Sequence, residues 1–136
     1  MFDVKVAIQE MAQGNAAAEE FCAILFHFIH MQDDLFDKDK PVTALELARM
    51  NYYLISMLAF NQFFHQHKEK ILPVILTSSM AWAASEAIVG TGTIEHITAQ
   101  VLKSQYQDIF YLTAFLVGGQ AHLETMSSKY REYNFD

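Results

Sequence analysis

Glycine and proline are scarce in this chain of 136 residues, and their positions divide it into segments of helical length. The five glycines and two prolines lie at positions 14, 41, 73, 90, 92, 118 and 119. Between these positions, apolar residues recur every three or four residues, which is the period of an amphipathic helix. Strand signals such as an Asn-Gly hairpin turn are missing from the sequence. The chain is therefore predicted to be all-α.

Five helices are expected, mostly antiparallel, in one bundle formed by the whole chain. They are predicted over residues 15–36, 43–67, 71–88, 94–117 and 120–132. Asn15 would cap the first helix, and the pair Thr43 and Glu46 forms a capping box at the start of the second. Pro73 is tolerated in the first turn of the third helix. Residues 1–14 would form a short helix or an arm.

The composition indicates an oligomer and argues against nucleic acid as a partner. Hydrophobic residues make up 52% of the chain, which gives more apolar surface than one small core needs, so a homo-oligomer is expected. The net charge of −7 with only nine basic residues does not suit a phosphate backbone. The single cysteine, Cys22, lies in an apolar run, which predicts a buried thiol in a reducing compartment.

The sequence gives no sign of a membrane span or a secretory signal peptide. The longest apolar segment, ILPVILTSSMAWAA at residues 71–84, contains a proline and a Thr-Ser-Ser interruption. It is also shorter than the roughly 18 residues that a membrane-spanning helix needs. A soluble, cytoplasmic protein is expected.

The stretch FIHMQDDLFDKDKP, residues 28–41, places several acidic groups on one helix face. His30, Asp33, Asp34 and Asp37 are spaced so that their side chains share a face over two helical turns. Carboxylates near a helix C-terminus are unfavourable because that end carries partial negative charge. A cation would offset this cost, and oxygen ligands with one imidazole suit Mg²⁺ or Mn²⁺. We therefore predict that these four residues are metal ligands.

The alternative is that the acidic stretch is a solvated helix end without a metal. In that interpretation water and two lysines, Lys38 and Lys40, screen the charge, and Asp37 or Asp39 caps a turn. Both interpretations remain open at the level of sequence.

Polar groups on the other expected helices could complete a site. Glu86 lies near the end of the helix 71–88, and Asp108 lies in an apolar part of the helix 94–117, where a buried carboxylate would need a partner. His30, Glu86 and Asp108 are the candidate catalytic residues, and Asp108 is also a candidate metal ligand. The candidate phosphate-binding residues are Lys38, Lys40 and Lys103, and those that could stack on a base are Trp82, Tyr106 and Tyr111.

The residues DDLFD at 33–37, preceded by His30, resemble the first aspartate-rich motif of trans-prenyl diphosphate synthases. In that family the aspartates hold Mg²⁺ ions that bind a diphosphate on a helical bundle. The resemblance covers about a dozen residues. It implies that Asp33, Asp34 and Asp37 are metal ligands.

Two looser resemblances concern architecture and origin. The size, acidity and helix-borne carboxylates are similar to those of MazG and dimeric dUTPase-type pyrophosphatases, which bind Mg²⁺ and cleave nucleoside triphosphates. The segments IHMQDDLFDKDKP, NQFFHQH and SQYQD look like those of small proteins carried by bacteriophages and prophages. That resemblance implies an origin and a fold.

These observations lead to three hypotheses on function. The first is a divalent-metal-dependent hydrolase of a phosphate-containing small molecule, most plausibly a nucleotide pyrophosphatase, with Mg²⁺ or Mn²⁺ as cofactor. The second is a non-catalytic helical interaction protein, such as a phage-encoded modulator or assembly factor. The third is a di-iron or di-manganese redox centre, for which the paired Glu-x-x-His motifs of ferritin-like bundles are missing.

Overall fold

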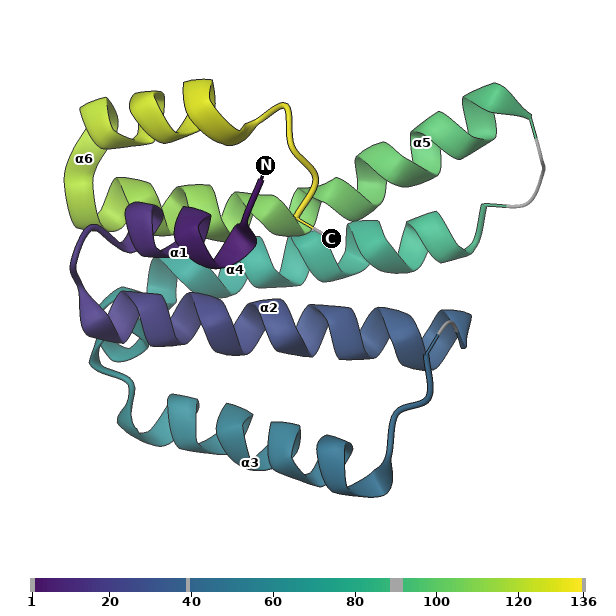
Figure 1. The fold of residues 1–136 in the computed structure, drawn as a ribbon, viewed down its shortest axis with the longest axis horizontal. Coiled ribbons are helices and arrows are strands. Elements are labelled where there is room, and N and C mark those ends of the chain that lie inside the picture. The colour runs from purple at the N-terminus through teal and green to yellow at the C-terminus, as the bar shows by residue number, and fades with distance from the viewer. Residues whose placement is uncertain (1, 39, 89–91, 136) are drawn as a thin grey trace.

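The computed structural model describes residues 2–38, 40–88 and 92–135, and these residues form an all-α bundle without strands (Figure 1). The prediction of an all-α, single-domain bundle is confirmed. The α-helices are α1 (Val4–Ala12), α2 (Ala16–Asp37), α3 (Ala44–Phe60), α4 (Gln62–Glu86), α5 (Thr93–Ser104) and α6 (Asp108–Tyr130). A short 3-10 turn, η1 (Gln105–Gln107), joins α5 to α6.

Side-chain caps begin the helices where local sequence signals predict them. Asn15 Oδ1 accepts a hydrogen bond from the Ala18 amide at 3.0 Å, and Thr43 Oγ1 accepts one from the Glu46 amide at 3.1 Å. These bonds satisfy amides that have no partner inside the helix. The N-terminal residues form a helix, α1, which packs against α2 and α6.

The boundary between α3 and α4 lies at Asn61, whereas the sequence predicted one helix over 43–67 and another over 71–88. Asn61 Oδ1 accepts a hydrogen bond from the Phe64 amide at 2.8 Å and so caps α4. Its Nδ2 donates to the Ala17 carbonyl of α2 at 2.9 Å. Pro73 consequently lies well inside α4 rather than in its first turn. A contact distant in sequence therefore sets this boundary.

The segment predicted as one helix over 94–117 is divided by η1. The predicted break after this segment is present. Gly119 has φ 80° and ψ −171°, a backbone conformation that residues with a Cβ rarely adopt. The chain reverses there, so the two arms of α6, residues 108–118 and 120–130, lie side by side (Figure 1).

Two of the central helices run in the same direction, which positions the candidate site. In Figure 1, α3 runs antiparallel to α2, and α4 then runs antiparallel to α3, so that α2 and α4 are parallel neighbours. Their C-terminal ends therefore lie at the same end of the bundle. The buried core contains Met11, Phe21, Phe110 and Tyr111. No described helix has the length and apolarity that crossing a membrane requires.

Candidate metal and ligand site

Carboxylates from α2 and α4 gather where these two helices end. Asp33 and Asp37 lie in the last two turns of α2, and Glu86 is the last residue of α4. One oxygen from each of the three carboxylates lies within 4.8 Å of the other two. Because both helix ends also carry partial negative charge, the electrostatic cost of this arrangement is greater than that of a single acidic helix end. A positive charge is needed nearby.

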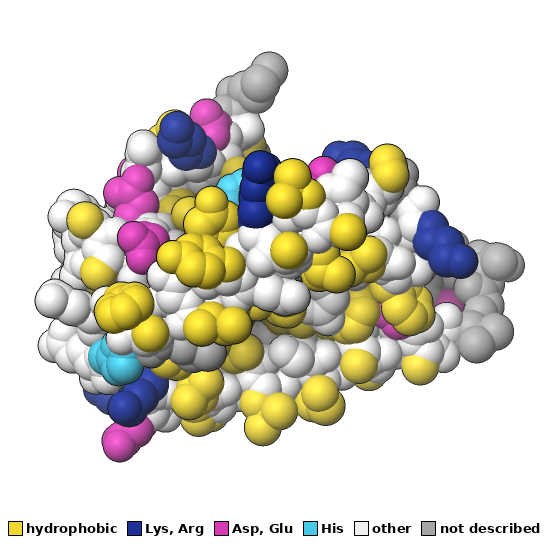
Figure 2. Space-filling view, turned by 90° about the horizontal axis from the view of Figure 1, so that it is seen from below, with side chains coloured by type: hydrophobic (Ala, Val, Ile, Leu, Met, Phe, Trp, Pro, Cys, Tyr) yellow, Lys and Arg dark blue, Asp and Glu magenta, His cyan; other side chains and the backbone are white. Residues whose placement is uncertain are grey.

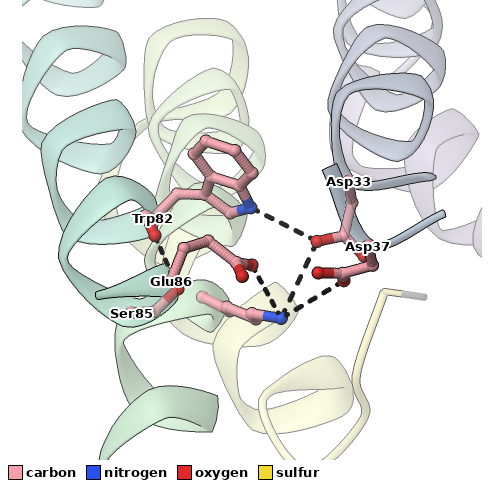
Figure 3. A network of polar contacts seen from close by, with 6 residues as sticks. Asp33, Asp37, Trp82, Ser85 and Glu86 are labelled. Carbon is pink, nitrogen blue, oxygen red and sulfur yellow. Dashed lines mark hydrogen bonds and ion pairs between the residues drawn. The ribbon is translucent and has the colours of Figure 1, made fainter. Parts of the chain in front are cut away.

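Lys103, in the last turn of α5, supplies a positive charge to the three carboxylates, whose side chains are labelled in Figure 3. Its Nζ lies 3.0 Å from Glu86 Oε1 and 3.7 Å from both Asp33 Oδ1 and Asp37 Oδ2. Its side chain is 30% exposed, while that of Glu86 is 13% exposed. Glu86 Oε1 is buried, and the Lys103 ammonium is its partner among the described residues. We call Asp33, Asp37, Glu86 and Lys103 the acidic cluster.

Trp82 fixes one side of the acidic cluster. Its indole Nε1 donates a hydrogen bond to Asp33 Oδ1 at 3.3 Å, and its ring packs edge-on against Phe36. The Ser85 hydroxyl donates to the Trp82 carbonyl at 2.6 Å near the end of α4 (Figure 3). The tryptophan therefore holds the Asp33 carboxylate beside Glu86.

The pKa values in the cluster reflect crowded negative charge. Burial raises the pKa of Asp37, and the charges of Asp33 and Glu86 raise it further, against the opposing effect of Lys103. Burial disfavours the charged form of Lys103, but contact with Glu86 and the charges of the two aspartates outweigh this effect, so its pKa is raised. With three carboxylates and one ammonium, the cluster holds a net charge of about −2 when all four groups are ionised.

A cavity of about 410 Å³ opens beside the cluster. It is lined by His30, Asp33, Asp34, Asp37, Lys40, Gln100, Lys103, Ser104 and Asn134. Six of these residues are metal-, phosphate- or proton-binding candidates from the sequence. The cavity therefore combines carboxylates, an imidazole and two ammonium groups, which is the chemistry that a phosphate ester with a divalent cation would need.

His30 is held by the C-terminal segment. Its Nε2 lies 3.0 Å from the carbonyl oxygen of Phe135, and its ring lies against Phe26 with the centroids 4.3 Å apart. Because a carbonyl only accepts hydrogen bonds, Nε2 must carry the proton in this contact. In the neutral imidazole, Nδ1 is then the basic nitrogen.

The expected convergence of Asp108 with the acidic residues is not found. Asp108 Oδ1 lies 2.9 Å from Arg131 Nη1, and both side chains are half exposed. The prediction assumed one continuous helix, in which Ser104 and Asp108 would share a face. Because η1 intervenes, Ser104 lines the cavity while Asp108 begins α6 and pairs with its C-terminal end.

Other predicted residues also lie apart from the cluster. Lys38 is the exposed C-cap of α2, in a left-handed conformation with φ 58°, and it does not line the cavity. Asp39 lies outside the described residues. Tyr106 and Tyr111 are buried, so neither ring is available to stack on a base.

Two cavity residues, Gln100 and Asn134, were not predicted from the sequence. Gln100 lies one turn before Lys103 on α5, so helical spacing could have identified it. Asn134 Oδ1 accepts a hydrogen bond from Gln107 Nε2 at 3.0 Å, a contact made by the C-terminal segment that no local pattern indicates.

Comparison of the chain with models of known protein families, with curated proteins and with solved structures found no match.

Proposed function

We propose that this protein is a divalent-cation-dependent hydrolase of a phosphate-containing small molecule, most plausibly a nucleotide pyrophosphatase. The observation that carries the proposal is that Asp33, Asp37 and Glu86 meet within 4.8 Å of one another, and that the two aspartates line a cavity that also contains two lysines. Carboxylates from two helices that meet beside basic groups are suited to hold a cation and a phosphate together.

The donor set fits a hard divalent cation. Asp33, Asp37 and Glu86 offer only oxygen ligands, which Mg²⁺ and Mn²⁺ prefer. Mg²⁺ holds its oxygen ligands at about 2 Å, so the three carboxylates would have to move closer together than their 4.8 Å spread around a bound ion. When bound, such a cation would neutralise charge on phosphate oxygens and activate a water molecule.

The lysines of the cavity would bind the substrate. Lys103 is the counter-ion of the carboxylates, and a cation that took over this role would leave its ammonium free to contact phosphate oxygens. Its flexible side chain, 30% exposed, suits such a change of partner. Lys40 lines the same cavity and would contribute a second positive charge.

His30 is the residue best placed to accept a proton from the attacking water. It lines the cavity, and its Nε2–H is directed at the Phe135 carbonyl, which leaves Nδ1 as the basic atom. The bond to Phe135 also orients the ring, as a fixed base requires. Asp34, in the same cavity wall, would bind a water molecule or act as a further ligand of the cation.

The proposal is tested by assaying pyrophosphate and phosphate release from the four common nucleoside triphosphates, with Mg²⁺ or Mn²⁺ and with chelator. Release is expected only with cation, and Asp33→Asn should abolish it. His30→Asn should reduce it by about 10²- to 10⁴-fold, the usual contribution of a general base. Asp108→Asn is the control, because this carboxylate lies outside the cluster, and it should retain activity. Release that persists in chelator or in Asp33→Asn would overturn the proposal.

A second candidate function is a non-catalytic interaction protein, such as a phage-encoded modulator. One observation favours it, namely that Lys103 already balances part of the charge of the carboxylates, which gives the acidic cluster a structural role without metal. In that case the melting temperature should not respond to cation, and substitution of the cluster should affect stability alone.

A further inference from the structure

The outer face of α3 exposes large apolar side chains in a regular pattern. Phe60, Tyr52 and Ile55 have exposed fractions of 81%, 68% and 67%. We define the α3 seam as Leu45, Ala48, Tyr52, Ile55 and Ala59, all of which are exposed. These positions are spaced by three, four, three and four residues, which is the spacing of the core positions of a coiled coil. Figure 2, which views the molecule from the side of α3, shows hydrophobic groups spread over this face.

The rest of the bundle leaves this seam uncovered. The helix α3 packs mainly on α2 and α4, and among its described side chains Met50 and Met57 are buried and Leu54 is partly buried. It therefore exposes more large apolar side chains than it buries, which is unfavourable for a helix whose outer face meets only water. A groove of about 430 Å³ beside the seam, lined by Ile24, Met50, Tyr52 and Tyr53 among others, extends the apolar surface toward α2.

The charge on α3 favours a second copy of the chain as the partner. Among the 17 residues of α3, Glu46 and Arg49 are the only charged ones, so this face is neutral in a chain whose net charge is −7. Two copies repel one another through most of their surfaces, but not through this face. A strongly charged partner would find no complementary charge here, whereas an identical neutral seam is self-complementary.

The seam leaves apolar area for a partner to bury. Its large side chains Leu45, Tyr52 and Ile55 have exposed fractions of 59%, 68% and 67%. The small Ala48 and Ala59 leave room for large side chains of the opposite helix.

We propose that the chain forms a symmetric homodimer in which the α3 seams of two copies pack against each other as a short coiled coil. This inference is independent of the chemistry of the acidic cluster, which lies at the ends of α2 and α4. The seam specifies both the surface and its partner, whereas the composition of the chain predicts only that an oligomer exists.

The test is the molar mass in solution, measured by light scattering during size-exclusion chromatography over a wide range of protein concentration. The wild type is expected at twice the monomer mass. Ile55→Glu should give a monomer with an unchanged helical circular dichroism spectrum, since the side chain is on the surface of each subunit. Tyr52→Lys, a second seam variant that introduces the opposite charge, should also give a folded monomer.

The controls are Leu76→Glu on α4 and Ile97→Glu on α5, which place the same charge at apolar side chains that are 60% and 55% exposed outside the seam. Both control variants should remain dimers. The proposal is overturned by a wild type that stays monomeric at all concentrations, by seam variants that stay dimeric, or by dissociation in the control variants instead.

Discussion

The ammonium group of Lys103 lies 3.0 Å from Glu86 Oε1, so the last turn of α5 neutralises a carboxylate at the end of α4. The same ammonium lies 3.7 Å from the nearer oxygens of Asp33 and Asp37. One lysine thus joins the ends of α2, α4 and α5. Its partial exposure and the excess of negative charge around it are the basis of the proposal that a divalent cation acts at this position.

Removal of Lys103 should destabilise the fold in the absence of cation. We expect Lys103→Met to lower the free energy of unfolding by about 1–2 kcal/mol, between the values for exposed and fully buried ion pairs. The loss should shrink at acid pH, where protonation removes the carboxylate charges. Thermal unfolding of wild type and Lys103→Met in chelator, at neutral and at acid pH, measures this loss of stability. Lys129→Met, which removes a more exposed pair with Glu10, is the control and should cost less than Lys103→Met does.

Asp37→Asn should stabilise the protein at neutral pH when no cation is present. Burial, with the charge of Asp33, raises the pKa of Asp37, so the folded chain binds this proton more tightly than the unfolded chain does. Stability therefore falls as pH rises from the ordinary Asp pKa, near 3.9, through the raised value. Melting curves in chelator should show a gain of up to a few degrees at pH 7 that vanishes below about pH 3.5. A destabilised variant at pH 7 would contradict this electrostatic account.

Cys22 should be inert in the folded protein. Its side chain is fully buried, and burial raises the pKa of the thiol to about 12 despite a contact between its Sγ and Thr113 Oγ1 at 3.5 Å. Because the thiolate is the reactive form, a chromogenic disulfide reagent at pH 8 should titrate no thiol in native protein and one per chain in denaturant. Rapid reaction in native conditions would show that α2 opens locally.

Gly119, in the turn inside α6, should be sensitive to substitution because of its backbone conformation. Its φ of 80° and ψ of −171° lie in a region that is almost restricted to glycine. Gly119→Ala is therefore expected to destabilise the fold by about 1–3 kcal/mol, although no atom lies within 4 Å of the added methyl group. Gln120→Ala, at the exposed neighbouring position, should change stability by less than about 0.5 kcal/mol. Chemical denaturation of both variants separates backbone strain from packing.

The features that local sequence chemistry controls were predicted correctly. Asn15 and Thr43 cap their helices because a side-chain oxygen reaches an amide three residues away, and Gly119 breaks a helix because of its own φ and ψ. The α3–α4 boundary was misplaced because Asn61 is held by the Ala17 carbonyl, which is 44 residues away in sequence.

The sequence brought together those residues of the candidate site that lie on one helix, but not those whose positions depend on how the helices pack. Spacing along one helix brings Asp33 and Asp37 together, and Glu86 was expected to join them. The counter-ion role of Lys103 depends on the parallel arrangement of α2 and α4 and on the packing of α5 against α4, which periodicity does not indicate. Asp108 was assigned to the site because η1 was not expected, and this turn directs it to Arg131 instead.

The melting temperature with and without divalent cation tests the central claim most directly. Wild type, Asp33→Asn, Asp37→Asn and Asp108→Asn are compared in chelator and in millimolar Mg²⁺ or Mn²⁺. A cation at 100 times its dissociation constant stabilises by about 2.7 kcal/mol, which corresponds to several degrees for a chain of this length. We predict this rise for wild type and Asp108→Asn, and its loss in the two cluster variants. No rise in wild type, or an equal rise in all four proteins, would contradict a cation site at the acidic cluster.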